Sequence, residues 1–322
     1  MKTIQLILIS LLLTGCNSAN SEQNKSAADQ SAAPTTATTA APAESGKAAD
    51  SKPVPTAGET LAELEKAEQS LTMADDLPVR VNRIALGYAS QGNFKESEKL
   101  LKRLVVLLEK PQVKATMQLA VTLNNLGLLY MQEKKYGKAE PLFQKSLVLQ
   151  QSSLGGSDPT FAGSVNNLAT LYYEQMRYKD ALPLFSRAMD IYKTKPASNA
   201  LALSKTMNNV AGCYSGLKEY DKAEQYLKES LAIEEKLPSN AAGLAAALNN
   251  LGYIYEIQGE YDKAAPLLKR GLEIAEKVYE PKSMELISFL DNNSYLLRKT
   301  NKVAEADKLK ARSKEILLAN NQ

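Results

Sequence analysis

Histidine and tryptophan are both absent from the 322 residues of this chain, and cysteine occurs only twice. Histidine is the commonest general base and the commonest metal ligand, so its absence argues against catalysis and against a metal site. Two cysteines allow at most one internal disulfide, which excludes a disulfide framework. The sequence also contains no glycine-rich phosphate loop and no nucleophile elbow, so we expect no cofactor.

The charges are nearly balanced, with 39 Lys and Arg against 36 Asp and Glu and a net charge of +3. Nucleic-acid binding usually leaves a clustered basic stripe, and this balance does not provide one. We therefore expect no nucleic-acid partner.

The first fifteen residues have the character of a secretory signal peptide. Lys2 precedes a short apolar run from Ile4 to Leu13, roughly half of the ~20 residues that a membrane-spanning helix needs. The run ends in Leu-Thr-Gly-Cys, which resembles the bacterial lipobox. That resemblance implies cleavage before Cys16 and lipidation of Cys16, and two or more lipid chains anchor a protein stably. In the enterobacterial sorting scheme, an Asp after the cysteine resembles a signal for retention in the inner membrane. This chain has Asn17 there instead. The resemblance therefore implies a lipid-anchored protein of the bacterial cell envelope, in the outer membrane and facing the periplasm.

A polar tether is expected over residues 16–58. It consists mostly of Ser, Ala, Thr, Asn, Gln and Pro, and Val54 is its only large aliphatic residue. Such a segment cannot bury enough apolar area to offset its ordering entropy, so we expect it to be disordered. A flexible chain of this length spans roughly 35 Å and would hold the folded part away from a membrane.

From about residue 78 the sequence repeats itself. A polar residue that opens an Asn-Asn-like pair recurs at positions 82, 124, 166, 208, 249 and 291. A small residue lies fifteen places after each of these, at Ser97, Ala139, Ala181, Ala223, Ala264 and Ala306. An aromatic residue lies twelve places on in the first five copies, and turn sequences such as Gln91-Gly92-Asn93 lie between. This pattern predicts six helix-turn-helix units that stack to form a shared core, which is an all-α fold.

These recurring positions resemble those of the tetratricopeptide repeat. Val, Leu or Met stands where that repeat usually has a Trp in its first helix. The Asn-Asn pair, the 42-residue period and the Ala-x-Pro-Leu runs at 139, 181 and 264 are similar to the kinesin-light-chain subtype. The resemblance implies a right-handed superhelical solenoid over residues 78–319, with repeats starting near 79, 121, 163, 205, 246 and 288. A capping helix is expected before it, within residues 59–77.

In that family the first helices line a concave groove that binds extended peptides. By this register the groove should present the second residue of each pair, at Asn125, Asn167, Asn209, Asn250 and Asn292, together with Tyr173, Tyr253 and Tyr295. An Asn side chain both donates and accepts, so this column could hold a peptide backbone. The same amides could instead bridge adjacent repeats, and the sequence leaves both alternatives open. Lys205 with Asn209 and Asn250 faintly resembles a carboxylate clamp, although Ala246 and Ser288 do not supply the further basic residues that the clamp needs.

The sequence therefore favours a non-catalytic interaction scaffold, anchored in the envelope, that binds extended peptides or assembly partners. One alternative is a self-associating structural lipoprotein, against which the polar last helix argues. Another is a hydrolase that uses the groove carboxylates Glu174 and Glu256, although no orienting partners are evident for them. Cys213 is expected to be a small buried hydrophobe.

Overall fold

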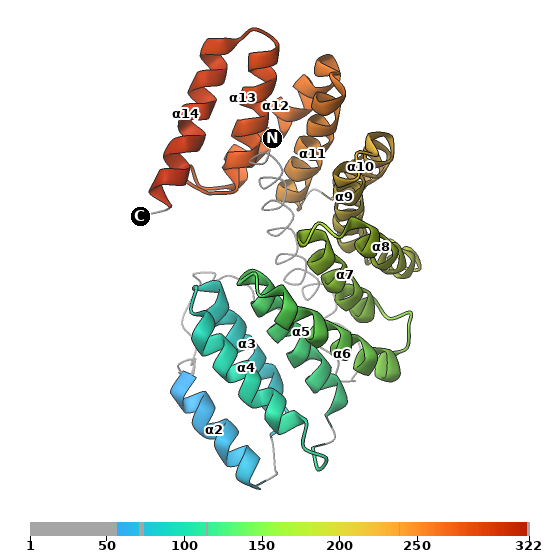
Figure 1. Ribbon diagram of the computed structural model, residues 1–322, viewed down its shortest axis with the longest axis vertical. Helices are drawn as coiled ribbons and strands as arrows, with labels where there is room; N and C mark the ends of the chain where they lie inside the picture. Colours follow the sequence, from blue (N-terminus) through green and yellow to red (C-terminus); the bar gives the residue numbers. More distant parts are fainter. Residues whose placement is uncertain (1–56, 71–73, 114, 238, 321–322) are drawn as a thin grey trace. The chain divides into compact units, whose positions relative to one another are not determined.

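The computed structural model describes residues 57–70, 74–113, 115–237 and 239–320, and every regular element in them is an α-helix (Figure 1). The all-α prediction is therefore confirmed. These residues form two compact units, 57–171 and 172–320, that divide within one helix. The signal peptide, Cys16 and the tether lie outside the described residues.

Residues 57–171 contain five helices and most of a sixth. They are α2 (Ala57–Ser70), α3 (Leu77–Ser90), α4 (Phe94–Leu108), α5 (Thr116–Gln132), α6 (Tyr136–Leu154) and α7 (Pro159–Glu174). The capping helix expected before the array corresponds to α2, which packs against α4.

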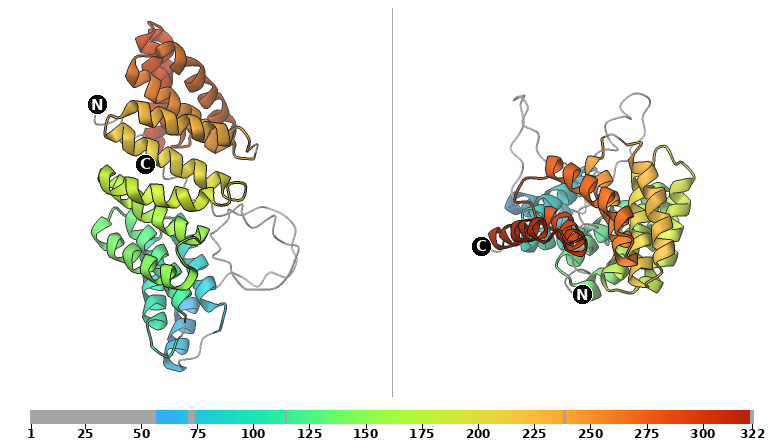
Figure 2. Two further views of the ribbon diagram at one scale, coloured as in Figure 1. Left: turned by 90° about the vertical axis from the view of Figure 1, so that its right-hand side faces the viewer. Right: turned by 90° about the horizontal axis from the view of Figure 1, so that it is seen from above.

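Residues 172–320 contain the end of α7 and seven further helices. They are α8 (Tyr178–Lys193), α9 (Ala200–Gly216), α10 (Tyr220–Glu234), α11 (Ala241–Gln258), α12 (Tyr261–Val278), α13 (Leu286–Lys299) and α14 (Val303–Ala319). Consecutive helices pair as hairpins, for example α9 with α10, α11 with α12 and α13 with α14 (Figure 2).

The first helix of every hairpin ends in the same backbone geometry. These first helices are α3, α5, α7, α9, α11 and α13. A residue with positive φ follows each of them, at Gly92, Lys134, Met176, Lys218, Gly259 and Asn301. The next N–H then donates back to the helix, as Asn93 does to the carbonyl of Tyr88 and Glu219 to the carbonyl of Tyr214, which is the bond of a Schellman cap. Only Gly92 and Gly259 suit this conformation without cost. At the other four positions the hairpin packing imposes a backbone that costs a non-glycine residue about 1–2 kcal/mol.

The small residues that recur once in each repeat share one environment. They are all fully buried, at Ser97, Ala139, Ala181, Ala223, Ala264 and Ala306. Glycines on the first helices allow equally close contact. A β-carbon on Gly127 would lie 2.8 Å from the ring of Phe143, and one on Gly252 would lie 2.7 Å from the side chain of Leu268. The hairpins therefore close because neither helix carries a branched side chain at the crossing.

Tyrosines near the ends of the first helices join successive repeats. The Tyr130 hydroxyl donates to Glu98 at 2.8 Å, and the Tyr255 hydroxyl donates to Glu224 at 3.0 Å. Each carboxylate also pairs with a lysine one turn further on, Lys102 or Lys228. The same polar link thus recurs three repeats apart.

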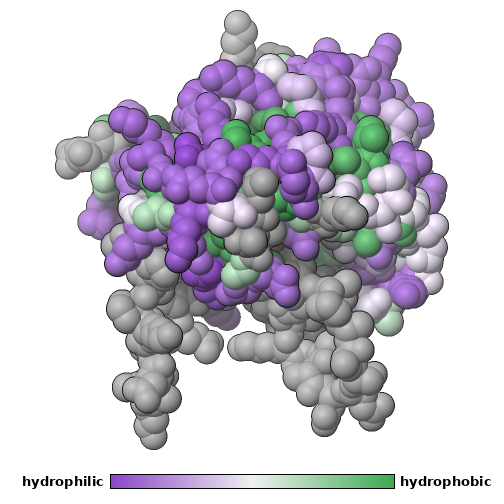
Figure 3. Space-filling view, turned by 90° about the horizontal axis from the view of Figure 1, so that it is seen from below, coloured by the Kyte–Doolittle hydropathy of each residue, from purple (hydrophilic) through white to green (hydrophobic). Residues whose placement is uncertain are grey.

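The face drawn in Figure 3 is mostly hydrophilic, with hydrophobic areas among the polar ones. On the last helix, α14, only Ala306, Ser313 and Ile316 are buried. Its polar character agrees with a capping role, although Leu317 and Leu318 are exposed near its end.

Candidate partner-binding face

The Asn column forms a ladder between repeats. In each rung the second amide of one repeat donates to the first amide of the preceding repeat. The rungs are Asn125 to Asn82 at 2.8 Å, Asn167 to Asn124 at 3.1 Å, Asn250 to Asn208 at 3.3 Å and Asn292 to Asn249 at 3.2 Å. The bridging alternative that the sequence left open is therefore realised in both units.

The ladder limits what these amides can offer a peptide. Asn125, Asn250 and Asn292 are buried, whereas Asn167 is only partly buried. Asn209 is buried as well, and its Nδ2 has no acceptor within residues 172–320. Each bridging amide retains one N–H and its carbonyl oxygen for other contacts. Peptide binding by this column stays a prediction, and Asn167 is its most accessible member.

We expect Asn292→Ala to destabilise the chain by about 1–3 kcal/mol, because it leaves the Oδ1 of Asn249 buried without its donor. A double-mutant cycle with Asn249→Ala isolates the bond, since the double variant removes both partners. Urea unfolding should show that the double variant loses about 1 kcal/mol less than the sum of the single variants. Additive losses would mean that the rung contributes nothing.

Tyr173 corrects the expected groove surface. It lies at groove register in the sequence, but its side chain is only 5% exposed. The ring packs over α9, where β-carbons on Gly212 and Gly216 would lie 2.8 Å from Tyr173 and 2.3 Å from Tyr178. The prediction that Tyr173 is a surface anchor is therefore wrong, because Gly212 of α9 makes room for its ring.

Tyr253 and Tyr295 keep more of the accessibility that the sequence predicted. They occupy the position that Gly212 takes in α9, on α11 and α13 respectively. Tyr253 is partly buried, and burial raises its pKa to about 12. Tyr295 is 38% exposed, and the Nζ of Lys299 lies 5.2 Å from its ring centroid.

Glu256 lies one turn after Tyr253 on the same side of α11. Its side chain is 7% exposed, and its Oε2 has no hydrogen-bond donor among the described residues. Burial raises the pKa of this carboxyl to about 8, and the charge of Lys299 opposes that rise. We call Tyr253, Glu256, Ile257, Tyr295 and Lys299 the aromatic face.

Electrostatic interactions link the titratable members of the aromatic face. Tyr253 interacts with Glu256, with Tyr295 and with Tyr220 at the start of α10, while Lys299 acts on Glu256. The sequence analysis did not single out Lys299 or Tyr220. Lys299 follows Tyr295 by four residues, just as Ile257 follows Tyr253. This spacing is the signal that could have identified Lys299.

Lys205 is engaged within the protein. It is partly buried on α9, and its charge lowers the pKa of the buried Glu234, although desolvation outweighs this and the net shift is upward. Glu234 also accepts hydrogen bonds from Ser204 and from Asn240, the latter at 2.6 Å. The clamp role of Lys205 stays a prediction, and its proximity to Glu234 weakens its attraction for a ligand carboxylate.

The two carboxylates of the hydrolase alternative have different surroundings. Glu174 ends α7 and is partly buried, whereas Glu256 is buried in the aromatic face. Burial also raises the pKa of the fully buried Cys213 thiol far above its ordinary value, which disfavours the thiolate that nucleophilic attack needs. Among the described residues no cluster of His, Cys, Asp and Glu could hold a metal ion.

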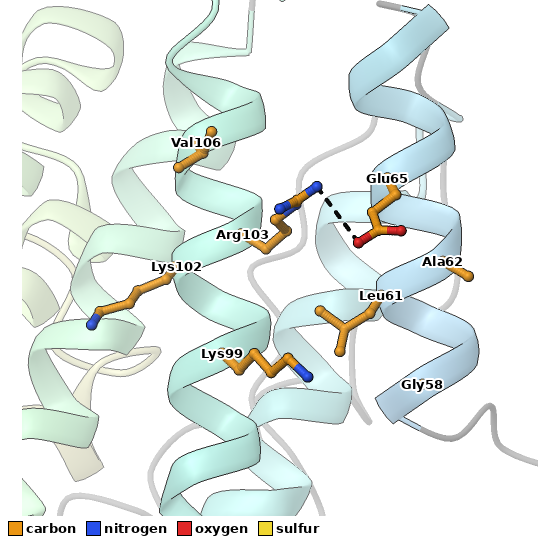
Figure 4. Close-up of a pocket in the computed structure, with 8 residues that line it drawn as sticks. All are labelled: Gly58, Leu61, Ala62, Glu65, Lys99, Lys102, Arg103 and Val106. Atoms are coloured by element: carbon orange, nitrogen blue, oxygen red, sulfur yellow. Dashed lines mark ion pairs between the residues drawn. The ribbon is translucent and has the colours of Figure 1, made fainter.

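A hollow of about 490 Å³ lies between α2 and α4 (Figure 4). Leu61 and Val106 give it an apolar lining, while Lys99, Lys102 and Arg103 contribute charge. Arg103 points toward Glu65 across the hollow and also pairs with Glu68 at 2.8 Å. Lys102 also pairs with Glu98, so most of the basic charge that lines the hollow is already neutralised. We therefore regard the aromatic face as the stronger candidate.

Sequence profiles described as tetratricopeptide repeat match residues 119–160, 160–236 and 243–319, which together make up more than half of the chain. The chain belongs to the tetratricopeptide repeat family. Arrays of this family are typically non-catalytic interaction scaffolds. The comparison with curated proteins returned no match.

Solved structures share the tetratricopeptide fold. BtubC from P. vanneervenii is 24% identical with a TM-score of 0.57, covering 71% of this chain and 90% of its own. A putative kinesin light chain from Podosopora anserina is 20% identical with a TM-score of 0.55, covering 64% and 99%. A Rap protein complexed with competence and sporulation factor is 18% identical with a TM-score of 0.56, covering 80% of each chain. At these identities the likeness establishes the fold alone.

No helix among the described residues is long and apolar enough to cross a membrane.

Proposed function

We infer that this chain is a lipid-anchored scaffold of the bacterial envelope whose tetratricopeptide array binds an extended segment of a protein partner. The aromatic face carries the binding part of this proposal. It combines two partly accessible tyrosines with Ile257, which is exposed, on helices that the Asn ladder holds together. Rigid amphipathic rings are efficient anchors for a partner because little entropy is lost when they are covered.

Two further observations support the proposal. The first is the apolar run that ends in Leu-Thr-Gly-Cys, on which the lipid anchor at Cys16 and the outer-membrane location rest. The second is the Rap protein of similar fold that has been solved in complex with competence and sporulation factor. A tetratricopeptide array can thus hold another molecule, which here would be an envelope assembly partner.

The experiment is photo-crosslinking in the native cells. A benzoylphenylalanine at Tyr295 on α13 is compared with one at Val278, the last residue of α12, which has similar exposure. We expect discrete adducts at Tyr295 and none at Val278. Equal adduct patterns at both positions would contradict directed binding by the first helices.

The anchor is tested on the same cells by labelling with radioactive palmitate. The unmodified chain should incorporate the label, and Cys16→Ser should incorporate none because the lipid attachment site is lost. An unmodified chain that incorporates no label would contradict the anchor and would leave the crosslinking result unaffected.

A further inference from the structure

Glu256 is a buried carboxyl that the repeat fold does not require. The corresponding positions of the other five repeats hold Ala89, Met131, Tyr173, Ser215 and Arg298, none of which is acidic. Burying a carboxylate oxygen without a donor costs free energy, and Oε2 of Glu256 has none among the described residues. A group that is costly to the fold and unused within it points to a ligand.

The surroundings of Glu256 are those of a cation site. Tyr253 lies one turn away on α11, and it interacts with Tyr295 on α13. Aromatic faces attract cations through their quadrupole, and a carboxylate adds a charge-assisted hydrogen bond. An anionic ligand would instead meet the carboxyl of Glu256.

The site already attracts a cation from the chain itself. Lys299 is exposed, its Nζ lies 5.2 Å from the Tyr295 ring centroid, and its charge acts on Glu256. No hydrogen bond or ion pair joins Lys299 to Glu256 among the described residues. Lys299 therefore shows that the site attracts a cation, although Lys299 does not pair with Glu256. Its flexible side chain can move aside.

We propose that Glu256, Tyr253 and Tyr295 receive an arginine side chain of the bound partner, which displaces Lys299. A guanidinium can stack on a tyrosine ring while it donates two parallel hydrogen bonds to a carboxylate. This inference rests on the proposed function, because it names the chemistry of the partner segment that the aromatic face holds.

Arginine binding at this site releases a proton. Glu256 is mostly protonated near pH 7 in the free protein, since its pKa is raised to about 8, and it must ionise to pair with arginine. Lys299 on α13 and Tyr253 on α11 interact with Glu256, while Tyr220 on α10 and Tyr295 on α13 interact with Tyr253. Affinity should therefore rise about tenfold from pH 6 to pH 7 and level off above pH 8.

The test is a ligand-observed NMR titration of the full-length chain with N-acetyl-arginine amide. The neutral isostere N-acetyl-citrulline amide serves as the control probe. We expect a Kd of about 1–10 mM for the arginine probe at pH 8 and at least tenfold weaker binding of citrulline. Equal binding of the two probes would overturn the proposal.

Three variants separate the site from the fold. Glu256→Gln should weaken the arginine probe at least tenfold and abolish the pH dependence, whereas Glu273→Gln, on the exposed surface of α12, should change neither. Lys299→Ala should strengthen binding, because it removes the competing internal cation. An unchanged Kd in Glu256→Gln, or weaker binding in Lys299→Ala, would overturn the proposal. Lys299 is exposed, so that variant keeps the test valid even if Glu256→Gln alters folding.

Failure here is distinguishable from failure of the proposed function. Crosslinks at Tyr295 without arginine binding would mean that the aromatic face holds a partner of other chemistry. Arginine binding without crosslinks would instead retain the cation site and remove the partner-binding role.

Discussion

Gly252→Leu is expected to destabilise the chain by about 3 kcal/mol, because it forces apart the hairpin of α11 and α12. A β-carbon at Gly252 would lie 2.7 Å from the Leu268 side chain and 3.3 Å from the Leu268 backbone nitrogen. Leu268 is fully buried, so its side chain has no free space into which it can rotate. The backbone contact cannot be relieved by any rotamer. The two helices must therefore separate, which also loosens the contacts of each with its neighbours.

Gly137→Leu on α6 is the matched control. Gly137 is exposed, and a β-carbon there meets nothing within 4 Å. Since leucine is a better helix former than glycine, this variant should gain up to about 1 kcal/mol. Urea unfolding followed by circular dichroism measures both variants. Equal behaviour of the two would mean that Gly252 is not at a close helix crossing.

Glu256→Gln is expected to stabilise the chain by about 5 kcal/mol at pH 9 and to have little effect at pH 4. The pKa of Glu256 is about 8 in the folded state and near its ordinary 4.5 in the unfolded state. At pH 4 the carboxyl is largely neutral in both states. As the pH rises from about 4.5 to about 8, ionisation favours the unfolded chain, so stability is lost. Glutamine does not ionise and avoids that loss.

The measurement is the free energy of unfolding of both proteins from pH 4 to pH 9. Glu234 also has a raised pKa from burial, but it is present in both proteins and cancels in the difference. Glu273→Gln should show no gap that depends on pH. A gap of constant size for Glu256→Gln would show that Glu256 is not held neutral by the fold.

The ladder illustrates how much of the candidate site could be predicted from sequence. The Asn pairs at 124 and 249 are plain in the sequence, and their spacing correctly assigns them to first helices. An amide can serve either a ligand or a neighbouring repeat, so residue identity could not choose between these roles. The choice depends on the distance between adjacent first helices, which brings Asn292 within 3.2 Å of Asn249.

Tyr173 and Tyr295 show the same limit for exposure. Both lie at groove register in the sequence, but Tyr173 is buried and Tyr295 is accessible. For Tyr173 the reason lies on α9. Gly212 leaves room there for its ring, and the importance of that glycine is evident only once the helices are packed.

The sequence by itself determined the helical class, the six-unit register and the fully buried small-residue column. These follow from periodicity, because a side chain that recurs at the same helical position in every unit must meet the same packing environment. Only the tertiary structure decided which individual polar groups are buried, bridged or left without a partner, as for Asn209 and Glu256. Those outcomes depend on the particular neighbour that each helix meets, and burial in turn sets the pKa of Glu256.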